Sequence, residues 1–151
     1  MTTAGTLEIQ IVEARLERDT DTFTKMDPYV EIEMRMQRYR TQVKGGAGLE
    51  PTWNETMTMD VKYIGDDMKI KVYDEDITDS DLVCEGIIKL SALCINEGLD
   101  EWHELQYKGK KAGMIHLISK WTSFQMEKEA EQDEARKQAS EEAHRARFQY
   151  T

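Results

Sequence analysis

Apolar and polar residues alternate in short segments along most of this chain. Leu7, Ile9 and Ile11 are separated by Glu8 and Gln10. A period of two places the apolar side chains on one face of a strand and the polar ones on the other. The same alternation recurs in segments 29–34, 39–43, 53–61, 68–72, 86–89, 102–105 and 114–118. Short strands separated by Gly, Asp and Asn predict an all-β chain folded as an eight-stranded antiparallel β-sandwich.

The pattern changes after Trp121. Residues 125–148 contain no Gly or Pro and are rich in Glu, Ala, Gln, Lys and Arg, which are good helix formers. Oppositely charged residues stand four apart in this stretch, namely Asp133 with Lys137 and Glu141 with Arg145, a spacing that stabilises a helix. We therefore predict a sandwich domain over residues 1–121 and a charged, helical tail over residues 122–151.

One side of the predicted tail helix carries only small residues. They are Ala135, Ala139, Ala143 and Ala146. Because the stripe contains no large apolar side chain, one interpretation is a solvated helix with frayed ends. The other is a docking helix that lays its alanines on a protein partner.

Composition limits the classes of partner and the compartment. The net charge of −10 opposes binding to nucleic acid, and also to anionic lipid unless something neutralises it. Cys84 and Cys94 are the only cysteines, which fits a reducing compartment and no disulfide framework. No signal peptide and no apolar run near 18 residues is recognisable. We expect a cytoplasmic protein that does not bind nucleic acid.

Five aspartates in two short segments are the most unusual chemistry of the chain. They are Asp21, Asp27, Asp74, Asp76 and Asp81. The first two bracket the connection between the first two predicted strands, and the other three follow the fifth. Bare carboxylates repel one another at short range. A hard cation that takes six to eight oxygen ligands removes this repulsion, and calcium is the usual one.

The segments around these aspartates resemble a known family. Asp27-Pro28-Tyr29-Val30, then Pro51-Thr52-Trp53-Asn54-Glu55, then Val72-Tyr73-Asp74-Glu75-Asp76 look like the motifs of the C2 domain, a calcium- and phospholipid-binding module. The likeness is strongest to the small single-C2 proteins of plants and protists. It implies an eight-stranded antiparallel sandwich with calcium held between loops at one end. Because no strand precedes the one before the first acidic loop, the type II topology is expected.

By this resemblance, Asp21 and Asp27 are calcium ligands from the first loop, and Asp74, Asp76 and Asp81 are ligands from the third. The segment from Asp74 to Asp81 is one residue shorter than in many calcium-binding relatives, so Asp79 is a candidate for a replacement or additional ligand. We expect two calcium ions. The alternative is that the acidic loops are solvated and bind no metal, as in many C2 folds.

Calcium would change the charge of these loops. The eight acidic residues of the loops are Asp19, Asp21, Asp27, Asp74, Glu75, Asp76, Asp79 and Asp81, and Arg15, Arg18 and Lys25 offset three of them (3 − 8 = −5). Two calcium ions add +4, which nearly cancels the charge and allows an anionic phospholipid surface to approach. Phe23 and Ile77 lie near the middles of the two loops. They are candidates to enter the headgroup region, or else they pack within their own loops.

Arg35, Arg38 and Arg40 form a second candidate lipid site, on and between the second and third predicted strands. In related domains, a similar strand face receives phosphoinositide headgroups. Glu31 and Glu33 interleave with these arginines, so a solvated face of mixed charge is the alternative.

Catalysis is not expected. His103, His116 and His144 are scattered, and none stands in a metal or catalytic-triad spacing. We predict a non-enzymatic, calcium-dependent phospholipid-binding module that associates reversibly with membranes. The alternative is a calcium-independent interaction or structural subunit of a larger assembly, such as a cytoskeletal one, with the sandwich as scaffold and the tail as docking helix.

Overall fold

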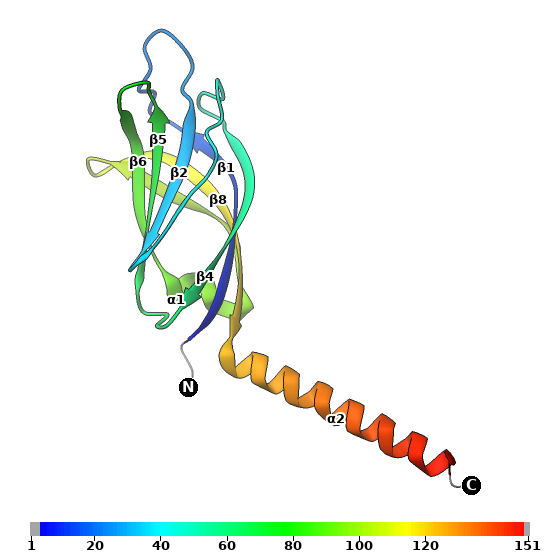
Figure 1. The fold of residues 1–151 in the computed structure, drawn as a ribbon. Coiled ribbons are helices and arrows are strands. Elements are labelled where there is room, and N and C mark those ends of the chain that lie inside the picture. The colour runs from blue at the N-terminus through cyan, green and yellow to red at the C-terminus, as the bar shows by residue number, and fades with distance from the viewer. Residues whose placement is uncertain (1–3, 150–151) are drawn as a thin grey trace.

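The computed structural model describes residues 4–149, so residues 1–3 of the predicted sandwich and 150–151 of the predicted tail lie outside the described part. The strands are β1 (Gly5–Leu16), β2 (Pro28–Met34), β3 (Gln37–Arg40), β4 (Thr52–Val61), β5 (Asp67–Glu75), β6 (Ser80–Lys89), β7 (Asp100–Tyr107) and β8 (Lys110–Ser123). A short helix α1 (Leu90–Cys94) and a 3-10 turn (Ile95–Glu97) connect β6 to β7, and a long helix α2 (Phe124–Gln149) follows β8. Figure 1 shows the sandwich with α2 extending from one end.

The strands form two four-stranded layers. Their hydrogen-bonded order is β3-β2-β5-β6-β7-β8-β1-β4, and neighbouring strands are antiparallel. The last strand lies directly beside the first, as expected for the type II topology. The predicted eight-stranded antiparallel sandwich is therefore confirmed.

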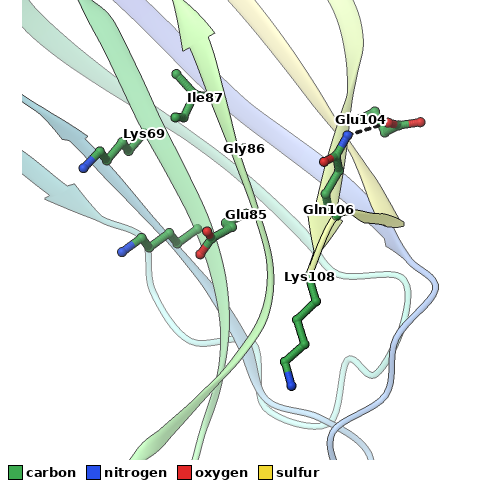
Figure 2. A pocket seen from close by; sticks show the side chains of 9 residues that line it. Lys69, Glu85, Gly86, Ile87, Glu104, Gln106 and Lys108 are labelled. Carbon is green, nitrogen blue, oxygen red and sulfur yellow. Dashed lines mark hydrogen bonds between the residues drawn. The ribbon is translucent and has the colours of Figure 1, made fainter.

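The two layers separate between β6 and β7, which pair only through Glu85 and Gln106. A hollow of about 580 Å³ lies beside this gap. Figure 2 shows Lys69 of β5 on one side of it and Lys108 on the other. The Gln106 side chain donates a hydrogen bond to Glu104 at 3.2 Å. The sandwich is thus nearly closed, with its opening along this seam.

The core follows the alternation of the sequence. On β1, Leu7, Ile9 and Ile11 are fully buried, while Glu8 between them is exposed. The apolar residues of β2, β4, β5 and β8 face them from the other strands, and α1 closes one end of the core with Leu90 and Leu93. Burial of these side chains is the main favourable contribution to folding.

Three elements differ from the sequence prediction: β3, β6, which begins at Ser80 rather than at Gly86, and α1. The third strand ends at Arg40 rather than continuing to position 43. The reason is Thr41, which is buried and whose hydroxyl accepts a hydrogen bond from the Val30 N–H at 2.9 Å. Helix α1 was not predicted, because five residues are too few for a recognisable helical period.

The tail is a continuous helix, α2, that begins immediately after β8. The Ser123 hydroxyl accepts a hydrogen bond from the Met126 N–H at 3.1 Å, which is the usual role of serine at a helix N-cap. Every side chain from 128 to 147 is exposed. Neither this helix nor any other in the described part of the chain is long and apolar enough to cross a membrane.

Candidate functional site

Three loops meet at the end of the sandwich opposite α2 (Figure 1). They are residues 17–27, residues 41–51 and residues 76–79. Five of the six predicted calcium ligands lie in these loops or at the strand ends beside them, and Asp81 lies near the start of β6. The acidic segments, far apart in the sequence, are therefore brought to one end of a rigid scaffold.

Asp74, at the end of β5, is the centre of this arrangement. It is only 5% exposed. One carboxylate oxygen, Oδ1, accepts a hydrogen bond from the Asp27 backbone N–H at 2.8 Å. The other, Oδ2, accepts one from the Thr20 hydroxyl at 2.8 Å. A buried carboxylate needs such partners, and here both come from the first loop, so Asp74 ties the first loop to the third.

Asp27 extends the connection to the middle loop. Its Oδ1 accepts a hydrogen bond from the Gly46 N–H at 2.7 Å. Its backbone carbonyl accepts one from the Glu75 N–H at 3.0 Å. Asp27 is half-buried. These contacts fix its carboxylate close to the end of β5, beside Asp74.

Asp21 is held by its own loop. Its Oδ1 accepts from the Thr24 N–H at 3.0 Å and the Phe23 N–H at 3.2 Å, and its Oδ2 accepts from the Thr24 hydroxyl at 2.6 Å. The Thr24 hydroxyl and these backbone donors lower the pKa of Asp21 below its ordinary value. Its carboxylate is therefore available as an anion even in mildly acidic solution.

The remaining three carboxylates are exposed. Asp81 stands opposite Asp74 in the register of β5 and β6. Asp76 accepts a hydrogen bond from the Ile77 N–H at 2.7 Å, and Asp79 accepts one from the Ser80 N–H at 2.8 Å. Asp27, Asp74 and Asp81 thus occupy adjacent strand ends, while Asp21, Asp76 and Asp79 lie farther out on the loops.

The donor set fits calcium in its chemistry, because all six side chains offer hard carboxylate oxygens at one end of the sandwich. Within residues 4–149, no three acidic, histidine or cysteine side chains are close enough to one another to form a metal-binding group. Five of the six carboxylates, those of Asp21, Asp27, Asp74, Asp76 and Asp79, instead accept hydrogen bonds from N–H or O–H donors of the loops and strand ends.

A sequence profile of the C2 domain matches residues 5–105. The chain belongs to the C2 domain family. Elicitor-responsive protein 3 of rice (Oryza sativa subsp. japonica) is 39% identical over 90 residues, which are 59% of this chain and 62% of that protein. The 16 kDa phloem protein 2 of Arabidopsis thaliana is 37% identical over 92 residues, 60% of this chain and 63% of that one. These curated relatives are thus matched over less than two thirds of their length, and the expected likeness to small plant C2 proteins is confirmed.

Solved C2 domains have the same architecture. The calcium-bound pair of C2 domains of extended synaptotagmin 2 superposes with a TM-score of 0.71 and 28% identity, over 82% of this chain and 47% of that one. The C2 domain-containing protein from a putative elicitor-responsive gene gives a TM-score of 0.69 and 29% identity, over 82% and 92% of the two chains.

Two residues of this C2 domain hold the loops but were not predicted. Thr20 supplies the hydroxyl that binds Asp74. Arg18 donates a hydrogen bond to the Leu82 carbonyl at 2.5 Å and lies over the Tyr107 ring at 3.6 Å, so it fastens the first loop to β6 and β7. Neither role has a local sequence signal, because each partner lies more than fifty positions away.

The apolar side chains of the C2 loops point into solvent. Phe23 is 96% exposed and Ile77 is 101% exposed. Neither side chain packs within its own loop. Both side chains are therefore accessible to a partner surface.

The predicted basic face of the C2 domain is neutralised by its own acids. Arg38 forms ion pairs with Glu31 and Glu33, both at 3.5 Å. Arg40 lies 3.7 Å from the carboxylate of Glu75 and 3.8 Å from the centre of the Tyr29 ring. The third arginine, Arg35, pairs with Asp66. All three guanidinium groups therefore have carboxylate partners within the domain.

Proposed function

We propose that this C2 domain attaches reversibly to anionic phospholipid surfaces when its acidic loops bind calcium. The observation that carries the proposal is the buried carboxylate of Asp74, which joins the first and third loops at one end of the sandwich. It fixes the spacing of the two acidic segments before any ion arrives. Such preorganisation reduces the conformational cost of binding.

The residues that would hold the ions are Asp21, Asp27, Asp74, Asp76, Asp79 and Asp81. Bound calcium would supply positive charge and accept further oxygen ligands, including those of lipid phosphate or carboxylate groups. Two ions would change the loop charge from −5 to −1, counted from the eight acidic and three basic residues. Repulsion between the loops and an anionic surface would then largely disappear.

The loop tips complete the proposed membrane contact. Phe23 and Ile77 stand fully in water, and transfer of such side chains into a lipid headgroup region removes apolar surface from water. We place the primary lipid contact at these loops rather than at Arg35, Arg38 and Arg40, because the arginines are already paired with carboxylates. The calcium-bound extended synaptotagmin 2 domains support the calcium part of the proposal by likeness. We further propose that the protein is cytoplasmic and non-enzymatic.

Calorimetric calcium titration followed by co-sedimentation with phosphatidylserine vesicles tests this function. Asp76→Asn/Asp81→Asn removes two exposed ligands whose loss should not disturb the fold. Asp60→Asn/Asp67→Asn is the matched control, because it makes the same change in net charge away from the loops. We expect the first variant, and not the second, to lose calcium heat and vesicle binding. Vesicle binding that is equally strong in excess EDTA would overturn the proposal.

A calcium-independent interaction or structural subunit is the second candidate function. Two observations favour it: the described carboxylates do not form a closed metal-binding group, and α2 extends from the sandwich with exposed side chains. This function predicts that the protein assembles at the same protein concentration in calcium and in EDTA. It also predicts that the protein binds vesicles in neither condition.

A further inference from the structure

Helix α2 has 26 residues and stands apart from the sandwich that carries it (Figure 1). Its described side chains from 128 to 147 are all exposed. A helix that is polar all round is supported by intrahelical ion pairs or by a partner.

We propose that α2 pairs side by side and antiparallel with α2 of a second copy of this chain, in a register centred on Ala139. In this register, residues that stand equally far before and after Ala139 lie at the same level. Ala135 then faces the partner's Ala143, Gln132 faces the partner's Ala146, and Ala139 faces itself. At 3.6 residues per turn, these five residues lie within about 40° of Ala139 around the helix. We call these five residues the seam. In this register, the seam of one helix faces the seam of the other.

The charged residues beside the seam are an independent argument for the same register. Glu129 and Arg147 lie about 80° from the seam on one flank, with Asp133 farther round at about 120°. Glu131 lies about 80° from the seam on the other flank, with Arg145 and Glu134 farther round at about 120° and 140°. A two-fold axis places the same flank of both helices on the same side. Arg147 therefore lies within two residues of the level of the partner's Glu129 and Asp133. Arg145 lies equally close to the partner's Glu131 and within one residue of the level of the partner's Glu134.

Other arrangements lose this complementarity. A parallel pair would place each acidic residue of segment 127–134 beside its own copy, and that segment carries five acids and one lysine. Like charges at such spacing repel. Moving the antiparallel centre by one turn, to Ala135 or Ala143, places Ala139 level with Glu131 or Arg147. Only the central alanine then faces its own copy, and the other alanines of the seam no longer face small residues.

The sandwich lies beside only the start of α2, where Gln125, Met126 and Glu129 line a hollow with residues of the sandwich. The described parts of the two helices overlap over residues 129–149, and β8 ends at Ser123, before the overlap begins. The two sandwiches are attached at opposite ends of the pair, about 48 Å apart along the helix axis at 1.5 Å per residue. Because α2 leaves the end opposite the acidic loops (Figure 1), those loops remain accessible in both copies.

Sedimentation equilibrium of the full chain in EDTA is the first test. We expect the average mass to rise with protein concentration toward twice 17.6 kDa and to fall again at high ionic strength, because exposed charge pairs are screened. EDTA separates this inference from the calcium proposal. A chain that remains monomeric at every concentration in low salt would overturn the pairing.

Charge reversal tests the register. The first variant is Arg145→Glu/Arg147→Glu, and the second changes Glu129, Glu131, Asp133 and Glu134 to Lys. Each variant alone should be monomeric, because like charges then meet on both flanks. An equimolar mixture should dimerise again, since the reversed acids of one chain meet the reversed bases of the other. Rescue on mixing excludes loss of helix as the cause, and a mixture that stays monomeric overturns the register.

A control variant carries similar charge on the far side of the helix. Ala130 and Lys137 lie about 180° and 160° from the seam. Ala130→Glu/Lys137→Glu adds three negative charges, against four in Arg145→Glu/Arg147→Glu. It should dimerise as the unaltered chain does. Equal loss of dimer in the control would mean that net charge alone is responsible, which overturns the inference.

A spin label distinguishes the antiparallel pair from a parallel one. The variant Glu127→Cys provides an exposed thiol for the label. The two native thiols should react slowly, because burial raises the pKa of Cys84 to about 12 and that of Cys94 to about 11. The antiparallel register separates the two labels by about 36 Å along the axis. A distance distribution confined to short separations would show a parallel pair and contradict the assignment.

Discussion

Asp74 shows how one side chain can organise a site before any ligand binds. Its two carboxylate oxygens accept hydrogen bonds from Thr20 and from the backbone of Asp27. Both donors belong to the first loop, and Asp74 itself lies at the end of β5. The residue that resemblance identifies as a calcium ligand is therefore also a structural connection between loops. Its two roles can be separated by measuring stability without calcium.

Asp74→Ala should lower the free energy of unfolding by about 2 kcal/mol in EDTA, because it leaves the half-buried Asp27 N–H and the half-buried Thr20 hydroxyl without acceptors. Urea unfolding followed by tryptophan fluorescence measures this change. The control is Asp76→Ala, whose carboxylate is exposed and whose loss should cost no more than about 0.5 kcal/mol. Equal effects of the two substitutions would contradict a structural role for Asp74.

His103 is the residue whose environment is least satisfied in the described part of the chain. Its Nε2 is buried and has no hydrogen-bond partner there. Burial lowers the pKa of His103 below its ordinary value of 6.5, an effect that Glu101 opposes and His116 reinforces. The folded protein therefore resists protonation of this imidazole more than the unfolded chain does. His103 favours the folded state above pH 6.5, and this contribution is lost as the pH falls through its lowered folded pKa.

His103→Gln removes this titration. The stability of the unaltered protein should fall relative to that of His103→Gln as the pH is lowered from about 7.5 to 5.5, a range that brackets the ordinary histidine pKa. Urea unfolding of both proteins at the two pH values gives the difference between their free energies of unfolding. The carboxylates that both proteins share titrate equally in both, so their effect cancels in this difference. An identical pH dependence of the two proteins would contradict the assignment.

At the scale of the elements, strand pairing decides which charges remain available. Glu31 stands opposite Arg40 in the register of β2 and β3, and Glu33 stands opposite Arg38. Acidic and basic side chains thus share one face of adjacent strands. The arginines were candidate lipid ligands in the sequence, and their ion pairs with Glu31, Glu33 and Glu75 favour the alternative of a mixed-charge face.

Arg38→Ala/Arg40→Ala should therefore change calcium-dependent vesicle affinity by less than about threefold, because both arginines are paired with carboxylates and their face carries no net positive charge to attract anionic lipid. Co-sedimentation with vesicles that contain phosphoinositide measures the change, and Lys89→Ala/Lys111→Ala is the matched control for lost positive charge. A loss of tenfold or more that is specific to the arginine variant would mean that the ion pairs open to receive a headgroup.

At the scale of the whole molecule, the two ends of the sandwich are chemically distinct. One end gathers the acidic loops and the exposed Phe23 and Ile77. The other carries α2, whose charges are complementary to those of a second copy. The proposed pairing would place two loop ends on one particle. Membrane contact and self-association would then use separate surfaces of a chain of 151 residues.

Local patterns in the chain were enough to predict the alternation of buried and exposed positions, and with it the sandwich, the tail helix and the family motifs, because side-chain period and helix propensity are local properties. The folded structure was needed to find that Asp74 binds Thr20, that Arg18 fastens the first loop to β6 and that the arginines meet glutamates. It also decided that Phe23 and Ile77 stay in water. These outcomes depend on which distant segments become neighbours, and hydrogen bonds and ion pairs between such segments leave no periodic signal in the chain.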